Sequence, residues 1–171
     1  MTGVQTCALP ICKVALLIGH ETRNPQWADI AARGSSSVDD ARVRASAIES
    51  LWGLTTPAAK DAFRRAARDT RHRVAGAGAV ALFIAGDPEG MSAIFAFARS
   101  EQPEFRATAA WAMGQTANPS FLPALGPLLK DPEQSPRTLA VKSMVAIRTR
   151  MKKVREAGSI ARSEEHTSEL Q

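Results

Sequence analysis

The sequence has no tyrosine, and aromatic residues of all kinds make up only 5% of its 171 residues. Strands of sandwich and barrel domains are enriched in aromatic and β-branched residues, so this scarcity argues against an all-β core. Alanine, which has the highest helix propensity, is abundant instead. The composition therefore favours an all-α fold whose helices approach one another closely.

Cysteine and histidine are scarce as well, with two and three residues. Neither of the internal histidines, His20 and His72, has a second ligand or base at a recognisable spacing. The alanine- and glycine-rich stretch at 75–79 lacks the Lys-Ser/Thr pair that a phosphate-binding loop requires. The acidic residues fall mostly at expected helix starts or in turns, where helix capping and ion pairing explain them. We therefore expect no catalytic residue, no metal site and no cofactor.

Both ends of the chain read as translated sequencing-adapter DNA. The last ten residues, RSEEHTSELQ, translate one strand of such an adapter, and TGVQTCALPI at 2–11 translates its complement. We interpret residues 1–12 and 162–171 as non-native and leave them out of the fold prediction, as one would a fusion scar. Cys7, Cys12 and His166 then carry no evidence for a site, and we expect residues 13–161 to be a fragment of a larger protein.

A dipeptide made of a helix-capping residue and a proline occurs four times, with its prolines 32, 31 and 31 residues apart. A Ser, Thr, Asp or Asn side chain can accept a hydrogen bond from the first turn of a helix, where the missing N–H of proline costs nothing. A fixed period of this length is typical of stacked repeats. The four pairs are Asn24-Pro25, Thr56-Pro57, Asp87-Pro88 and Asn118-Pro119.

A second apolar helix, opening with an arginine, is expected between successive proline-started helices. We call it helix A and the proline-started helix that follows it helix B. The arginines are Arg44, Arg73, Arg106 and Arg137. The pattern predicts an all-α fold, an α-solenoid of stacked antiparallel helix pairs with a period of about 31 residues. We expect a truncated repeat at 13–38, repeats at 39–69, 70–101 and 102–132, and a partial repeat at 133–161.

Individual helices can be predicted within this frame. Helix A of the first full repeat should run from about Asp40 to Trp52, with Val43, Ala47, Ile48 and Leu51 on its apolar face. Its helix B should run from Pro57 to Arg68. The next helix A should span about 71–85, and the last should begin at Ser135-Pro136 and continue through 148–156.

Glycine and proline inside two of these helices predict special packing. Gly76 and Gly78 lower the helix propensity of the second helix A by about 1 kcal/mol each, which close packing against a neighbouring helix would explain. Pro127 removes an interior backbone hydrogen bond and should kink or shorten the third helix B.

These repeats resemble the HEAT-repeat family, in particular the short HEAT-like repeats of bacterial proteins that also occur in phycobilin lyase subunits. The resemblance rests on VRASAIESLWGL, HRVAGAGAVALFIAGDP, FRATAAWAMGQTANP and FLPALGPLLKDP, and covers nearly all of residues 13–155. The period is shorter than the 40 to 47 residues of typical HEAT units. Membership would imply an armadillo-like α-solenoid, from a bacterial protein, with a binding role and an unspecified ligand.

A partner-binding surface is expected on the helix-B face, because stacked helix pairs form an extended concave surface. Similar helical positions there are occupied by Lys60, Arg64, Met91, Phe95 and Leu122. These residues either fill gaps between adjacent B helices or form a half-apolar, half-basic groove for an acidic or amphipathic protein segment.

A basic run on the last helix suggests nucleic acid as an alternative partner. Its cations are Arg148, Arg150, Lys152, Lys153 and Arg155. No aromatic residues for base stacking are interleaved with them, and a charged helix is also compatible with a solvated face. The sequence thus predicts a non-catalytic protein-interaction scaffold, with a nucleic-acid-binding module and an accessory subunit of a lyase-type enzyme as alternatives. The compartment stays open, with the cytoplasm as the default.

Overall fold

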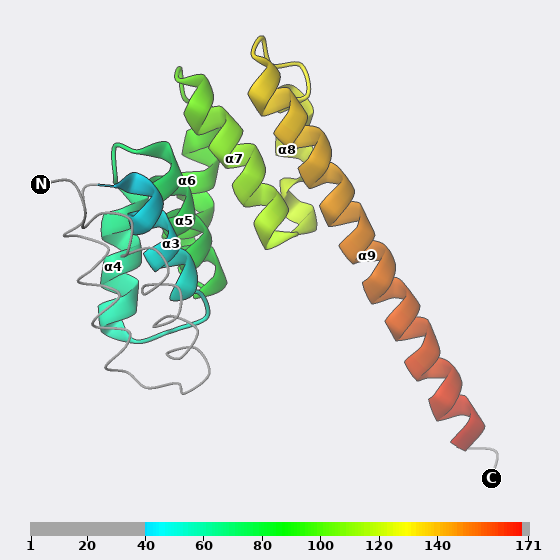
Figure 1. Ribbon diagram of the computed structural model, residues 1–171. Helices are drawn as coiled ribbons and strands as arrows, with labels where there is room; N and C mark the ends of the chain where they lie inside the picture. Colours follow the sequence, from blue (N-terminus) through cyan, green and yellow to red (C-terminus); the bar gives the residue numbers. More distant parts are fainter. Residues whose placement is uncertain (1–39, 169–171) are drawn as a thin grey trace, which may run out of the picture.

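The computed structural model describes the backbone of residues 40–168 and the side chains of residues 40–157. The described chain consists of helices joined by short turns and contains no strand (Figure 1). The elements are α3 (Ala41–Ser50), α4 (Pro57–Ala67), α5 (His72–Ile84), α6 (Pro88–Ala98), α7 (Pro103–Thr116), the 3₁₀ turn η1 (Pro119–Phe121), α8 (Leu122–Leu128) and α9 (Gln134–Ser168). The expected repeat at 13–38, with Asn24-Pro25 and His20, lies outside the described residues.

The capping residue and proline pairs begin helices as predicted. Thr56 Oγ1 accepts a hydrogen bond from the backbone N–H of Ala59 at the start of α4 (3.3 Å). Asp87 accepts one from Glu89 at the start of α6 (3.0 Å). Asn118 caps η1, which leads directly into α8. Local capping chemistry therefore sets the start of each B helix.

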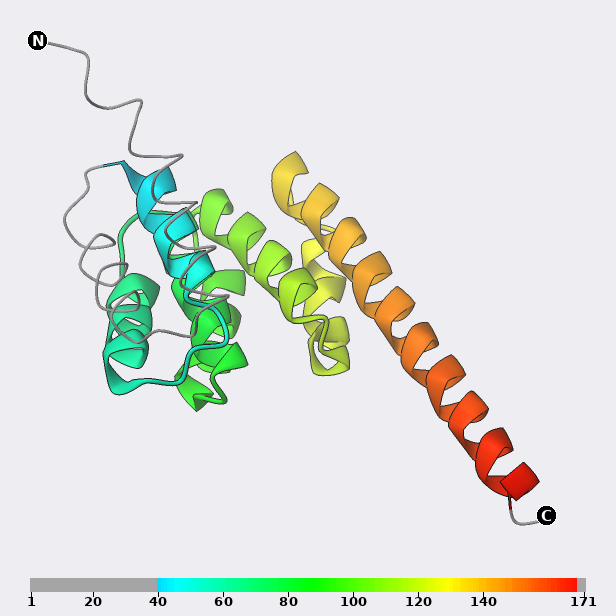
Figure 2. The same ribbon diagram turned by 60° about the horizontal axis from the view of Figure 1, so that its bottom comes forward.

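The helices form two layers, which confirms the all-α solenoid. Successive A helices pack on one another, α3 on α5, α5 on α7 and α7 on α9 (Figures 1 and 2). Helix α4 packs against α5, α6 lies against α5 and α7, and α8 packs on α9. Each unit thus shares its core with the next unit along the chain.

Among the described residues the core forms two clusters, and Ile48 and Leu51 of the predicted α3 face belong to the first. Ile48 on α3 and Phe63 on α4 are fully buried in the first cluster. Val43, Ala47 and Leu51 are also buried, as predicted, and so are Ala59 and Ala66 of α4. The second cluster contains Met113, Phe121 and Ile147, which are fully buried.

Close approach between helices explains the glycines of α5. A Cβ atom on Gly78 would lie 2.8 Å from the carbonyl carbon of Ala66 and would overlap the backbone nitrogen of Ala67 in α4. A Cβ atom on Gly76 would overlap Cγ2 of Thr108 in α7. The expected close packing is confirmed on both sides of α5.

The third helix B is shortened, as Pro127 predicted. Helix α8 has seven residues, contains Pro127 and is preceded by the 3₁₀ turn. Helix α9 begins at Gln134, one residue before the predicted Ser135-Pro136 start, and continues past Glu156.

Candidate functional site

A cleft of about 450 Å³ crosses the helix-A layer. Four consecutive A helices contribute to it, since its lining includes Ser46 of α3, His72 of α5, Trp111 of α7 and Leu139 of α9. A cleft shared by four units can hold a chain segment that runs across the repeats.

The floor of the cleft depends on the close approach of α5 and α7. Gly76 allows Thr108 to come against α5, and Thr108 Oγ1 lies 2.8 Å from Nδ1 of His72. Trp111 is half-buried beside Trp52, with ring centroids 6.2 Å apart. Trp52 Nε1 in turn donates a hydrogen bond to the carbonyl oxygen of Ala77 (3.2 Å). These contacts fix the indole of Trp111 at the cleft wall.

The rim carries charges of both signs. Arg42 and Glu49 come from α3, and Arg73 and Glu104 come from α5 and α7, all of them exposed. Burial and, to a smaller extent, the neighbouring Arg73 lower the pKa of His72 below its usual value, while Glu104 acts in the opposite direction. His72 is therefore neutral near pH 7, and its imidazole shares a hydrogen bond with Thr108 without adding charge to the cleft.

The cleft can bind an apolar side chain against Trp111, Ala107 and Leu139 and can form ion pairs at the rim. Thr108, the hydroxyl next to the imidazole, is only 7% exposed. Among the residues that the structure describes, no group of three His, Cys, Asp or Glu side chains could hold a metal ion.

None of the residues predicted for the partner surface lines this cleft. Lys60, Arg64, Met91, Phe95 and Leu122 lie on α4, α6 and α8, in the helix-B layer. Their role as a binding surface stays a prediction.

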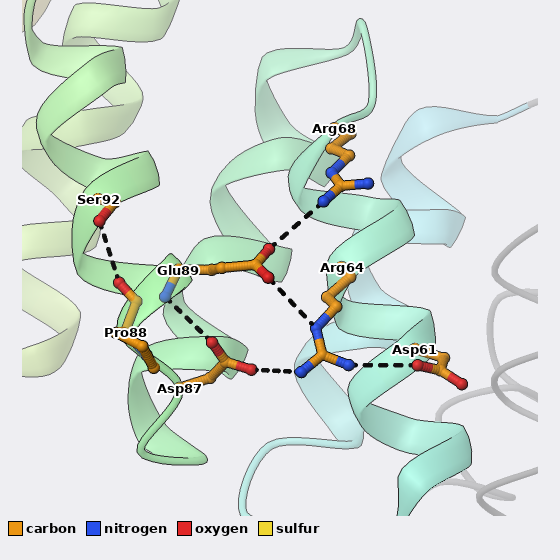
Figure 3. A network of polar contacts seen from close by, with 7 residues as sticks. All are labelled: Asp61, Arg64, Arg68, Asp87, Pro88, Glu89 and Ser92. Atoms are coloured by element: carbon orange, nitrogen blue, oxygen red, sulfur yellow. Dashed lines mark hydrogen bonds and ion pairs between the residues drawn. The ribbon is translucent and has the colours of Figure 1, made fainter.

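Arg64 is engaged by three carboxylates, as Figure 3 shows. Its guanidinium lies 2.7 Å from Asp87, 3.3 Å from Asp61 and 3.6 Å from Glu89. Arg68 adds a second cation to Glu89 at 3.5 Å. The backbone N–H of Glu89, followed by Arg64, lowers the pKa of Asp87 despite the opposing effect of burial. Arg64 thus links α4 to the start of α6.

The apolar members of the set pack within the helix-B layer. Met91, Phe95 and Leu122 are half-buried against the second core cluster. The ring of Phe95 lies 5.4 Å from that of Phe121. Phe95 therefore fills the space between α6 and the η1–α8 segment while keeping part of its surface in solvent.

The predicted basic residues of α9 are all exposed but do not share one face. At 100° per residue, Arg148, Lys152 and Arg155 follow one side of the helix, whereas Arg150 and Lys153 point elsewhere. Lys152 also lies 3.7 Å from Glu156. Nucleic-acid binding by this run stays a prediction.

Ion pairing of the acidic residues was expected, but sequence reasoning did not identify the specific pair that recurs along the solenoid. Arg44 pairs with Asp69 at 3.1 Å, and Arg106 pairs with Asp131 at 2.6 Å. In each case the arginine stands in helix A and the aspartate in the turn after helix B, 25 residues later. The guanidinium of Arg106 lowers the pKa of Asp131.

The middle unit lacks both members of this pair. Positions 31 residues after Arg44 and Asp69 hold Ala75 and Ser100. Arg73, which the sequence pattern groups with the other helix-A arginines, stands two residues out of register. Aligning the repeats by a fixed period, rather than by their first arginine, would have identified the pair.

Residues 91–157 match a family model described as HEAT repeats. No curated protein matches the sequence. None of the described helices combines the length and apolar character needed to cross a membrane.

Proposed function

Because residues 91–157 belong to the HEAT-repeat family and the preceding described helices continue the same stacking, we propose that this chain is a protein-interaction scaffold that binds a partner segment in the helix-A cleft. HEAT repeats commonly serve as scaffolds for protein interactions and are generally non-catalytic. The partner segment and the cleft as its site are our proposal.

The cleft across four A helices is the observation that carries this proposal. Its apolar wall, formed by Trp111, Ala107 and Leu139, offers an anchor for an apolar side chain. Aromatic residues that become buried on binding contribute disproportionately to binding energy at protein interfaces. Arg73 and Glu104 of the rim lie close to this wall. A segment that carries charges of both signs can pair with them in only one register.

A binding role also suits the polar groups inside the cleft. Thr108 is nearly buried, and its methyl group lies against Gly76, so its hydroxyl is poorly accessible to a substrate. Its contact with His72 joins α7 to α5. We assign this pair a positioning role in shaping the cleft.

The proposal is tested by selecting peptides from a displayed random library against the full chain and measuring their affinity by fluorescence anisotropy. Arg73→Glu should weaken the selected peptides by about tenfold, and Trp111→Ala by more, since tenfold corresponds to about 1.4 kcal/mol. Arg73 is exposed, so its substitution leaves the fold intact. Arg65→Glu, an exposed position on α4, is the matched control and should have no effect.

Two results would overturn the cleft as the binding site. If neither Arg73→Glu nor Trp111→Ala changes the affinity of the selected peptides, the cleft is excluded as their binding site. Peptides that lose affinity on Lys60→Glu instead would move the site to the helix-B face.

A further inference from the structure

The outer side of α9, which faces away from α7, carries exposed apolar residues. Val141 is 53% exposed and Val145 is 59% exposed. Thr138 is exposed on the same side, because the three residues lie at i, i+3 and i+7. Single exposed valines are common on protein surfaces, but Val141 and Val145 occupy positions that have equivalents in the earlier repeats.

In each preceding A helix that the structure describes, the position equivalent to Val141 is fully buried. Stepping back by 31 residues gives Ala110, Ala79 and Ile48, each with 0% exposure. In α7 the cover is the next A helix, since Ser143 Oγ of α9 donates a hydrogen bond to the carbonyl oxygen of Ala110 (2.7 Å). The position equivalent to Val145 is Gly114, where a Cβ atom would overlap Ser143. The valine side of α9 thus corresponds to the side on which each earlier A helix among the described residues packs against the next A helix.

The same side becomes basic further along the helix. At 100° per residue, Arg148, Lys152 and Arg155 continue the line of Val141 and Val145. Helix α9 extends beyond α7 and α8, so this part projects from the body of the solenoid (Figure 1). Glu156 pairs with Lys152, but both side chains are more than half exposed, so the pair is readily exchanged. We call Thr138, Val141, Val145, Arg148, Lys152 and Arg155 the α9 outer face.

We propose that the α9 outer face docks an acidic amphipathic helix of a partner protein. The helix lies alongside α9 in the way that α9 lies alongside α7, with the two running in the same direction (Figures 1 and 2). Its first half places small apolar residues on the valines, and its second half places carboxylates beside the cations. This surface is separate from the helix-A cleft, so the two proposals can fail independently.

Charge complementarity selects this partner over a second copy of the chain. Two α9 helices side by side in the same direction would oppose Arg148, Lys152 and Arg155 with the same three cations. In the opposite direction the cations of one copy would lie against the valines of the other. A helix with carboxylates in its second half removes both conflicts.

The test uses the full chain and a synthetic peptide based on α9 itself. The probe has the sequence of residues 134–155 with every lysine and arginine replaced by glutamate, so that it offers the side that α9 uses against α7 together with negative charge. The unaltered basic peptide is its control. In fluorescence anisotropy the acidic probe should bind at least about tenfold more tightly than the basic control.

Substitutions on α9 then locate the binding. Val141→Glu and Val145→Glu should each weaken the acidic probe by about tenfold, and both positions are exposed enough to accept glutamate without loss of the fold. Val154→Glu is the matched control, because Val154 is 62% exposed on the opposite side of α9. Reversing the charges of Arg148, Lys152 and Arg155 together should switch the preference to the basic peptide.

Three outcomes overturn the proposal. The first is an acidic probe that does not bind, or whose affinity is unchanged by both valine substitutions. The second is tight, salt-dependent binding of a labelled DNA duplex that requires the three cations while the probe does not bind, which assigns the face to nucleic acid. The third is a dimer in sedimentation equilibrium that Val141→Glu dissociates, which assigns it to a second copy.

Discussion

Replacing Gly78 by alanine sets helix propensity against interhelical packing. Gly78 lies in the interior of α5, where alanine should stabilise an isolated helix by about 1 kcal/mol. The added methyl group would overlap the backbone of Ala67 and lie 2.8 Å from both the carbonyl carbon and the Cβ atom of Ala66. Backbone atoms cannot rotate away, so α4 has to move away from α5.

The two effects differ enough in size to fix the sign. Overpacking of this kind typically costs about 1–3 kcal/mol, and a clash with backbone belongs at the upper end. After the gain in helix propensity, we expect Gly78→Ala to lower the free energy of unfolding by roughly 2 kcal/mol. For a chain of this size that corresponds to a fall in Tm of roughly 4–8 °C.

Urea unfolding followed by far-ultraviolet circular dichroism measures this change directly. Ala96→Gly is the control for helix propensity alone, because Ala96 lies on the exposed side of α6. That variant should lose no more than about 1 kcal/mol of unfolding free energy. A Gly78→Ala protein with unchanged or increased stability would refute the packing argument.

Three further substitutions test other contacts. Gly76→Ala should destabilise the protein. Adding Thr108→Ser to that variant should recover part of the loss, because serine lacks the overlapping methyl group but keeps the hydroxyl. If the changes in unfolding free energy of the two substitutions simply add, this coupling is contradicted. The pKa of His72 is lower in the folded chain than in the unfolded chain, so the unfolded chain binds more protons. The free energy of unfolding should therefore decrease as the pH is lowered below about 6.5. Urea titrations at several pH values should show a smaller decrease for His72→Gln. Phe121→Ala should cost about 3–5 kcal/mol in the same assay, since Phe121 is fully buried between Phe83 and Phe95.

The sequence was most informative where structure depends on neighbouring residues. Thr56-Pro57 and Asp87-Pro88 predict helix starts because a cap and a fixed φ act within one turn. The apolar face of α3 follows from helical periodicity for the same reason. Pro127 likewise shortens its own helix.

Contacts between helices were less accessible to sequence reasoning. The cleft depends on Gly76 meeting Thr108, two residues on different helices whose separation along the chain no local pattern encodes. The period predicted stacking, but it did not indicate which layer would be hollowed, and the binding surface was expected on the helix-B face. Arg64 illustrates the difficulty, because its three carboxylate neighbours come from both α4 and the next unit.

The alternating ionic pairs also bear on how units of this solenoid could be exchanged by recombination. Arg44 and Asp69 lie in one block of the period, as do Arg106 and Asp131, while Ala75 and Ser100 occupy the block between them. A crossover in the turn after the aspartate carries both members of a pair, or neither, into the product. A crossover inside helix B would combine an arginine with serine or an aspartate with alanine, leaving a partly buried charge without its counterion. The turns after helix B are therefore the boundaries at which whole units can be duplicated, deleted or reordered as cassettes.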